Sequence, residues 1–303
     1  MFAINGIFTF FITILLSFNL FAAKPITRIA TYNIRNYKKS LLINGTATHK
    51  IELLNIIKTT KADLIAVQEI VDDNDFKDFI RKYLPTFKVT LSKCGGLGNQ
   101  KLGFIYNTKI YQLKEFYEDH SIKDRSSGCR SGLRPAAVAI FKKKDSRLNI
   151  AAIAVHLKAG GGQNNADIRY KQLKKLSNII AGLRYDNYKH LVIMGDFNTT
   201  DYLLGNHNHD RFVDFTLKNN LIDFSEELEC TAYWWGGIDD GLNYGSVLDH
   251  VLISESLYDN FDSSHSKVMA HCNKVHCKAK DDLTLGRSYT QVSDHCPVVA
   301  TLK

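Results

Sequence analysis

Short apolar runs alternate with stretches of helical periodicity along the chain. Runs rich in Val, Ile, Leu and aromatic residues, bounded by polar or glycine-containing turns, predict β-strands. Several of these runs are apolar on both faces, so both faces of their sheet must be covered. The nine strands predicted in this way span residues 27–34, 64–68, 87–91, 102–106, 136–141, 148–157, 191–194, 247–253 and 297–302.

Apolar residues at spacings of three and four predict three helices. The clearest stripe follows the glycine loop 160–162, and another lies between cap candidates at 72–74 and Pro85, which would end the helix. Nine strands are too many for one small sheet. We therefore expect an α/β fold of two mixed sheets packed face to face, with helices outside. The three stripes are Leu53, Ile56 and Ile57; Phe76, Phe79, Ile80 and Tyr83; and Leu173, Leu176, Ile179, Ile180 and Leu183.

The first 23 residues differ in composition from the remainder of the chain. They contain no charged side chain, and the apolar run 7–22 ends at Ala22-Ala23-Lys24-Pro25. The length of this run favours a signal peptide over a membrane-spanning helix, which needs about 20 apolar residues. No Lys or Arg precedes the run, so an uncleaved anchor is the alternative. We expect a signal peptide at 1–23, one domain at 24–303, and a secreted or periplasmic location.

The chain is basic, with a formal charge of +8 and a pI of about 9.0. A basic surface raises the local concentration of polyanions, provided that salt does not screen it. A basic surface without a specific partner gives the same composition. The charge is therefore compatible with a nucleic-acid partner but does not identify one.

Six cysteines are present, an even number that is expected where disulfides persist. The neighbouring pair Cys272–Cys277 is the disulfide we expect first. The segment 271–277 also offers four zinc ligands, so a zinc site is the alternative, although an oxidising compartment favours the disulfide. The six are Cys94, Cys129, Cys230, Cys272, Cys277 and Cys296.

Polar side chains stand at the ends of several predicted strands, where a sheet can hold catalytic groups with little positional error. Together they supply carboxylates, amides and imidazoles, and hard oxygen ligands of this kind suit Mg²⁺. Hydrolysis of a phosphodiester needs charge neutralisation and proton transfer to and from oxygen, for which such a set is suited. No HExxH segment, GxSxG segment or glycine-rich phosphate loop is present, which disfavours zinc proteases, acyl transfer and P-loop chemistry.

Five of these segments occur in the order and approximate spacing of the endonuclease/exonuclease/phosphatase superfamily. The chain resembles its deoxyribonuclease I-like members from about residue 26 to residue 303. The resemblance implies a four-layer α/β/β/α sandwich of two face-to-face mixed β-sheets with outer helices. The matching segments are Asn33-Ile34-Arg35, Gln68-Glu69, Gly195-Asp196-Phe197-Asn198, Leu248-Asp249-His250 and Ser293-Asp294-His295.

The resemblance implies a metal site and two phosphate contacts. Glu69 resembles the principal metal ligand, with Asn33 and Asp294 completing or supporting the site. The ion is expected to be Mg²⁺, with Mn²⁺ or Ca²⁺ as alternatives. Arg35 resembles a phosphate contact, and Arg134 resembles an arginine that contacts DNA just before a strand.

The resemblance also assigns the groups that face the reacting atoms. Asp196 and Asn198 resemble the residues beside the scissile phosphate and the attacking water. His295 resembles the general base, oriented by Asp249. His156 resembles the second histidine, which in deoxyribonuclease I-like members assists protonation of the leaving group.

Two positions depart from the deoxyribonuclease I pattern. Gln100 replaces an acid that pairs with the second histidine, and a Gln can orient an imidazole without stabilising its charge. Val71 replaces an arginine, which removes one phosphate contact. The pair Trp234-Trp235 is expected to pack under a loop, and stacking on nucleic-acid bases is the alternative.

The sequence therefore predicts an exported, metal-dependent and monomeric nuclease that cleaves DNA, or also RNA, with little sequence preference. One alternative is a sphingomyelinase-like lipid phosphodiesterase on the same fold, although no exposed apolar hairpin for membrane insertion is evident in the sequence. A second alternative is a non-catalytic binding protein or toxin subunit, which the full set of metal and histidine residues disfavours.

Overall fold

The computed structural model describes residues 27–38, 47–123, 128–146, 148–204, 207–261 and 263–303. The predicted signal segment 1–23 lies outside these described residues, and its boundary with the domain stays a prediction. Within the described residues, no helix has the length and apolar character needed to cross a membrane.

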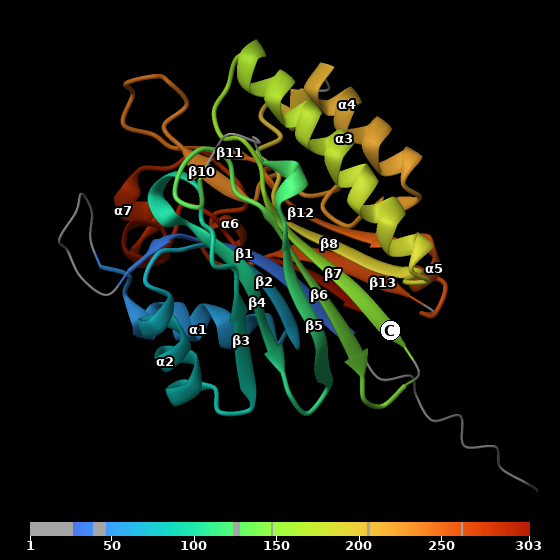
Figure 1. Cartoon of the computed structure of the whole chain (residues 1–303). Coiled ribbons are helices and arrows are strands. Elements are labelled where there is room, and N and C mark those ends of the chain that lie inside the picture. Colours follow the sequence, from blue (N-terminus) through green and yellow to red (C-terminus); the bar gives the residue numbers. More distant parts are fainter. Residues whose placement is uncertain (1–26, 39–46, 124–127, 147, 205–206, 262) are drawn as a thin grey trace, which may run out of the picture.

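Two mixed sheets of six strands each form the centre of the molecule (Figure 1). Each sheet has one central parallel pair, β1–β2 in the first sheet and β7–β8 in the second. The first sheet has the order β13-β14-β1-β2-β4-β3, with β1 (Thr27–Tyr37), β2 (Leu64–Ile70), β3 (Phe87–Leu91), β4 (Lys101–Asn107), β13 (Ser264–Val268) and β14 (Val298–Leu302). The second has the order β5-β6-β7-β8-β12-β9, with β5 (Tyr111–Asp119), β6 (Ala136–Lys143), β7 (Asn149–His156), β8 (His190–Asp196), β9 (Leu221–Asp223) and β12 (Asp249–Ser254). A separate hairpin joins β10 (Ala232–Trp234) to β11 (Tyr244–Ser246).

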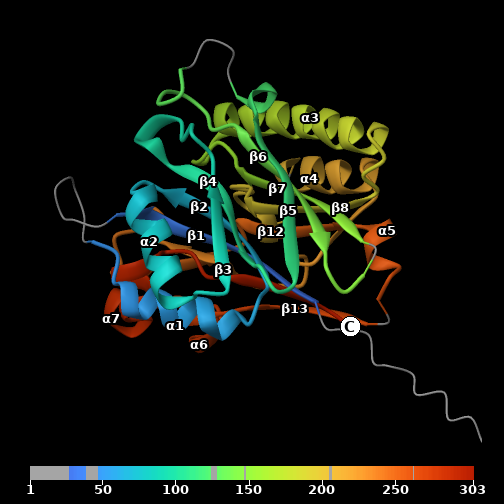
Figure 2. The same ribbon diagram turned by 60° about the horizontal axis from the view of Figure 1, so that its bottom comes forward.

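Helices cover the outer face of each sheet (Figure 2). Helices α1 (Lys50–Thr60) and α2 (Asp73–Tyr83) pack on the first sheet, and α3 (Gln163–Tyr185) and α4 (His207–Lys218) pack on the second. This arrangement confirms the predicted four-layer α/β/β/α sandwich. The shorter helices are α5 (Glu255–Tyr258), α6 (Ala270–Lys274) and α7 (Asp282–Leu285), and single helical turns span Leu97–Asn99, His120–Ile122, Tyr202–Leu204 and Ser288–Val292.

The core between the two sheets is apolar and fully buried. Phe104 of the first sheet meets Phe141 of the second edge to face, with ring centroids 5.7 Å apart. Edge-to-face packing suits the aromatic quadrupole and adds to the gain from burial. A second apolar layer joins the second sheet to α3 through the helical stripe that contains Leu173 and Leu176. Packing between the two sheets thus holds the sheets, and the ends of their strands, in fixed positions relative to each other.

All nine predicted strands and all three predicted helices are present. Helix α2 begins as expected, because a side-chain oxygen of Asp72 accepts a hydrogen bond from the backbone N–H of Asp75 at 3.2 Å. Strand β5, the short strands β9, β10, β11 and β13, and helix α4 were not among the predicted elements.

The predicted disulfide between Cys272 and Cys277 is wrong. Cys272 bonds to Cys296 and Cys277 bonds to Cys230. The backbone N–H of Cys277 donates to the carbonyl of Cys272, and Cys277 itself has a φ of +55°, so the helix-ending turn points the two side chains apart. The remaining cysteines form Cys94–Cys129, so no thiolate is left for the alternative zinc site.

Candidate active site

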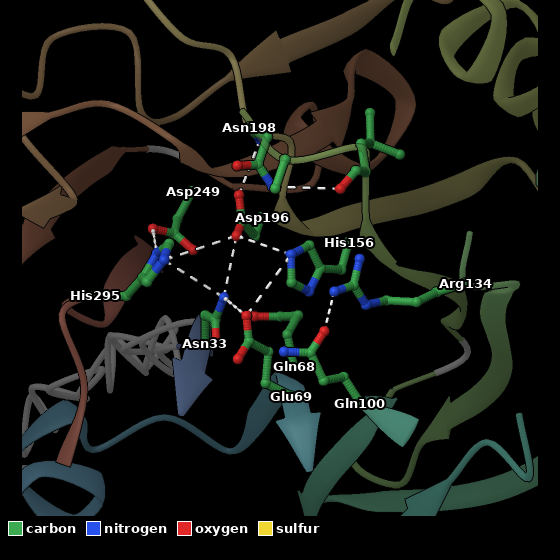
Figure 3. Close-up of polar contacts among 12 residues, drawn as sticks. Asn33, Gln68, Glu69, Gln100, Arg134, His156, Asp196, Asn198, Asp249 and His295 are labelled. Atoms are coloured by element: carbon green, nitrogen blue, oxygen red, sulfur yellow. Dashed lines mark hydrogen bonds and ion pairs between the residues drawn. The ribbon is translucent and has the colours of Figure 1, made fainter. Parts of the chain in front are cut away.

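The candidate active site lies where the carboxyl ends of the two central parallel pairs meet (Figure 3). Asn33 and Glu69 come from β1 and β2 of the first sheet, and His156 and Asp196 end β7 and β8 of the second. His295 approaches from the segment that leads into β14. Residues up to 262 positions apart in sequence therefore meet in one polar cluster.

Irregular backbone aims the first-sheet residues into the site. The pairing of β1 with β2 shifts register after Asn33, and a bulge of this kind redirects side chains. Glu69 has a φ of +63° and Asn36 a φ of +52°, in the left-handed region that costs about 1–3 kcal/mol for such residues. The Glu69 carboxylate accepts the backbone N–H of Asn36 at 2.9 Å, so the two unusual conformations support each other.

Close contact between β7 and β8 places the second-sheet residues side by side. Gly195 has a φ of +149°, and a Cβ atom there would lie 2.0 Å from the carbonyl oxygen of Val155. Only glycine permits this approach. The next residues in register, His156 and Asp196, then face each other, with Nε2 of the imidazole 3.3 Å from Oδ2 of the carboxylate.

Asp196 is the centre of the polar cluster. Its Oδ2 atom accepts a hydrogen bond from Nδ2 of Asn33 at 3.0 Å and lies 3.7 Å from Nε2 of His295. Its Oδ1 atom accepts the backbone N–H of Asn198 at 2.9 Å. Burial raises the pKa of Asp196 to about 7, although the nearby His295 imidazolium opposes the shift. Asp196 can therefore exchange a proton near neutral pH.

Asp249 and His295 form a buried carboxylate–imidazole pair. Oδ2 of Asp249 lies 2.7 Å from Nδ1 of His295, and Asp249 is fully buried. Burial alone would lower the pKa of His295, but the charges of Asp249 and Asp196 together raise the pKa well above its ordinary value. The pair thus has the geometry of a histidine base with an orienting acid.

Two hydroxyl side chains that sequence reasoning missed position this pair. The Ser293 hydroxyl donates to the backbone carbonyl of Asn33 at 2.7 Å and accepts the backbone N–H of His295 at 3.1 Å. The Thr231 hydroxyl oxygen accepts the backbone N–H of Asp249 at 2.9 Å. Ser293 belongs to a segment that the sequence singled out, whereas no sequence signal marks Thr231.

A buried arginine, Arg169, was also missed. Its guanidinium donates to the carbonyls of Lys158 and Gly160 at 2.9 and 2.7 Å and to the hydroxyl of Thr200 at 2.9 Å. It thereby joins the loop after His156 to the loop after Asp196. The sequence could have indicated this residue, because position 169 lies one helical turn before Leu173 and therefore on the apolar face of α3.

His156 does not have the partner that the sequence suggested. Its Nδ1 atom is buried and has no hydrogen-bond partner among the described residues. Gln100 instead donates to Oδ1 of Asn36 at 2.7 Å and accepts from the guanidinium of Arg134. Burial and the charges of Arg134 and His295 hold the pKa of His156 well below its ordinary value. His156 is therefore a neutral imidazole here.

Of the predicted metal ligands, Asn33 and Glu69 are in direct contact on the first-sheet side, and Asp294 is close enough for its charge to act on Glu69. Burial and the charge of Asp294 raise the pKa of Glu69. One oxygen of Asp294 is buried without a hydrogen-bond partner among the described residues and lies 4.0 Å from Nε of Arg35. Two nearby carboxylates, one with an unsatisfied oxygen, fit a divalent cation that prefers oxygen ligands. Asn33 presents Nδ2 to Glu69 at 3.2 Å while its Oδ1 accepts the N–H of Arg35, so direct ligation needs the amide to rotate.

A second group, Asp196, Asp249 and His295, also has ligand atoms within 4.8 Å of one another. Oδ2 of Asp249 contacts Nδ1 of His295, whereas Oδ1 of Asp249 is buried without a hydrogen-bond partner among the described residues. The structure therefore offers two places for an ion, and the sequence resemblance points to the one at Glu69.

The two predicted phosphate-binding arginines lie on different elements. Arg35 lies in the bulge of β1 and donates to the carbonyl of Thr290 at 3.0 Å, while its side chain stays partly exposed. Arg134 precedes β6, and the charges of Glu69 and Asp196 oppose the lowering of its pKa by burial.

Comparison with known proteins identifies a family and several structures of similar fold. The model of the Endonuclease/Exonuclease/phosphatase family matches residues 30–295. The fold is similar to TDP2 from Caenorhabditis elegans (TM-score 0.60, 15% identity, 91% of this chain and 75% of that chain). It is also similar to a mannosyl-6-phosphatase from Bacteroides thetaiotaomicron (TM-score 0.59, 17%, 90% and 98%) and to the human nocturnin catalytic domain with bound sulfate (TM-score 0.61, 15%, 92% and 94%). The search of curated proteins gave no match.

Proposed function

Because the chain belongs to the endonuclease/exonuclease/phosphatase family, we propose that it is a metal-dependent hydrolase of phosphodiester bonds in DNA, with RNA as an alternative substrate. The observation that carries the proposal is the buried Asp249–His295 pair beside Asp196, which the amide of Asn33 joins to Glu69. The arginines Arg35 and Arg134 lie beside this set. Contacts to phosphate carry no base information, so little sequence preference is expected.

His295 is the proposed base. Its Nδ1 atom is held by Asp249, which leaves Nε2 directed towards Asp196 and the cleft. In this position Nε2 can accept a proton from a water molecule that attacks phosphorus. Asp249 fixes the ring orientation and stabilises the imidazolium that forms.

Asp196 is the proposed partner in proton transfer to the leaving oxygen. A carboxyl with a pKa near 7 is protonated in part of the population at neutral pH and can donate. The backbone N–H of Asn198 donates a hydrogen bond to Asp196, which stabilises the ionised form of this carboxylate. His156, kept neutral by burial, has Nε2 3.3 Å from Oδ2 of Asp196, and its neutral imidazole can stabilise charge on a phosphoryl oxygen by hydrogen bonding.

A divalent cation is the proposed cofactor, held by Glu69 and Asp294 with Asn33 in support. When bound, it would neutralise charge on the phosphoryl oxygens and lower the pKa of the neighbouring His295. Oxygen ligands favour Mg²⁺, Mn²⁺ or Ca²⁺ over softer metals.

Export is part of the proposal. All six cysteines are paired, and disulfides of this number persist in oxidising compartments. Together with the apolar segment at the start of the chain, this supports a secreted or periplasmic location.

A lipid phosphodiesterase is the second candidate, and one observation favours it. The hairpin of β10 and β11 exposes Trp234, Trp235 and Ile238, each at least half accessible to solvent. The expectation that these tryptophans pack under a loop is therefore wrong. An exposed apolar hairpin is compatible with docking on a lipid surface.

Supercoiled plasmid incubated with purified protein tests the proposal, with Mg²⁺ or with EDTA. Nicked circles that appear before fragments, only with metal and not with His295→Ala, support an endonuclease. Choline-phosphate release from sphingomyelin vesicles, without any plasmid cleavage under the same conditions, would replace the proposal with the lipid candidate.

A further inference from the structure

The exposed tryptophans line a hollow that shares one residue, Asp294, with the candidate active site. Trp234, Trp235 and Ile238 line this cavity together with Asp294, and its volume is about 730 Å³. We call this cavity the tryptophan pocket. The proposed metal-site residue Asp294 thus belongs to both places, so a ligand in the pocket lies next to the reacting phosphate.

Hydrogen bonds connect the pocket to the catalytic segment. The backbone N–H of Tyr233 donates to the carbonyl of Asp294 at 2.9 Å, and Ala232 pairs with His295 in an isolated bridge. The indole N–H of Trp234 donates to the hydroxyl of Ser246 at 3.1 Å, which fixes the ring although half of it is exposed. A rigid aromatic face this close to the catalytic groups is suited to ligand binding.

The charge of the pocket limits what can occupy it. Carboxylates of Asp239, Asp281 and Asp282 line its walls, and none of the described lining residues is Lys or Arg. A second phosphate would be repelled. These carboxylates also oppose burial of the hairpin in a bilayer, because charged groups are costly there. The pocket therefore suits an uncharged flat group that offers N–H donors.

We propose that the tryptophan pocket binds one unpaired nucleobase adjacent to the scissile phosphate. The base stacks on Trp234 or Trp235, and carboxylates such as Asp239 accept N–H groups from its edge. A base still paired in a duplex is not free to turn into the pocket. The preferred substrate is therefore a nucleic acid with unpaired bases, such as a single strand, a frayed end or a melted stretch of supercoiled plasmid. This preference rests on the proposed phosphodiesterase function and narrows it.

Fluorescence offers a direct binding test, because the chain contains only two tryptophans and both lie in this pocket. A short single-stranded oligodeoxynucleotide of mixed sequence is titrated into the protein in EDTA, which prevents cleavage. Quenching without a blue shift supports the proposal, and a duplex of the same sequence should quench far less. Unchanged emission with the oligonucleotide, or a blue shift with sphingomyelin vesicles alone, overturns it.

Steady-state kinetics of oligonucleotide cleavage in Mg²⁺ provide a second test of the tryptophan pocket. Replacing by Ala whichever of Trp234 and Trp235 stacks on the base should raise the KM for the oligonucleotide roughly 5- to 150-fold, the range expected from stacking on one ring. Phe at the same position, which keeps a ring, should recover most of the loss. An oligonucleotide with an abasic position beside the cleaved bond should respond little to any of these variants.

A control variant and two further possible results distinguish the proposal of the tryptophan pocket from the proposal of phosphodiesterase activity. Tyr185→Ala removes an exposed aromatic ring at the end of α3, far along the chain from the pocket, and should leave KM unchanged. Wild-type KM in both tryptophan variants would refute the pocket while leaving the phosphodiesterase intact. Quenching by the oligonucleotide without any cleavage in Mg²⁺ would retain the pocket and refute the phosphodiesterase.

Discussion

Oδ2 of Asp249 lies 2.7 Å from Nδ1 of His295, although 46 residues separate the two in sequence. Both side chains are buried, so the imidazole has one orientation and one tautomer when neutral. Their separation in sequence means that the pair forms only when β12 and the segment before β14 are both in place.

Asp249→Asn should lower kcat about 10²- to 10⁴-fold, because the amide cannot stabilise the imidazolium. His295→Ala should cost a similar factor, and the double variant should be no worse than either single variant, since the pair acts as a unit. Steady-state kinetics on plasmid or oligonucleotide measure this. The exposed Asp214→Asn on α4 is the control, and a fully additive double variant would contradict a coupled pair.

The buried Asp196 predicts a specific pH dependence of stability. An unfolded Asp loses its proton near pH 4, whereas Asp196 in the folded protein keeps it to about pH 7. The unfolded chain binds fewer protons between these values, so the metal-free protein loses stability as the pH rises through this window. The substitution Asp196→Asn should remove this loss of stability at higher pH, because the amide does not ionise.

Calorimetry in EDTA should therefore give Asp196→Asn a higher Tm than wild type at pH 8 and an equal Tm at pH 4. The gain should be about 2–4 °C for each kcal/mol recovered. Hydrolysis in Mg²⁺ should fall by several orders of magnitude in the same variant. A lower Tm at pH 8 would show that ionised Asp196 stabilises the fold.

Metal binding should depend on Glu69. Saturating Mg²⁺ should raise the wild-type Tm, because a ligand at about 100 times its Kd adds about 2.7 kcal/mol. Glu69→Gln keeps the shape but loses the charge, so this increase and the activity should both disappear. Glu115→Gln changes an exposed acid on β5 and should preserve the increase. A Mg²⁺-dependent Tm shift that persists in Glu69→Gln would place the ion elsewhere.

The disulfides can be read directly from unreduced peptides. Mass spectrometry should find Cys272 linked to Cys296 and Cys230 linked to Cys277. Replacing Cys272 and Cys296 together by Ser should cost about 2–5 kcal/mol in the free energy of unfolding. Activity should also fall, since Cys296 directly follows His295. A Cys272–Cys277 peptide would contradict the structure.

Gly195 should not tolerate a side chain. Gly195→Ala would place a methyl group against the carbonyl of Val155 and separate β7 from β8, so chemical denaturation should show a large loss of stability. Gly182→Ala is the matched control, because it lies inside α3 with open space around its Cβ position. That variant should gain about 0.5–1 kcal/mol. Equal effects of both variants would contradict the close strand contact.

Regular periodicity explains which elements were predictable. The interiors of strands such as β7 and β8 are continuous apolar runs of the length typical of buried strands, bounded by polar residues. Strand β5 was missed because its pairing shifts register between Leu113 and Glu115, which breaks the alternation of apolar and polar residues. Helix α4 was missed because Phe212, Phe215 and the exposed Leu217 do not make a clean helical stripe.

The convergence of Asn33, Glu69 and Asp196 was predictable because each stands at the end of an apolar strand. The contacts between side chains were not. Gln100 contacts Arg134 rather than His156, and that choice depends on loops without periodic constraint. The disulfide pairing and the exposure of the tryptophans depend on the same kind of loops.

The division of the site between two sheets has a consequence for biosynthesis. The chain between Asn33 and His295 must be complete, and both layers must have closed on each other, before the cleft exists. A nascent polypeptide that has emerged only as far as the second layer holds His156 and Asp196 without a base to work with them. The polar cluster is therefore complete only after the residues that precede β14 have been synthesised and the two layers have packed together.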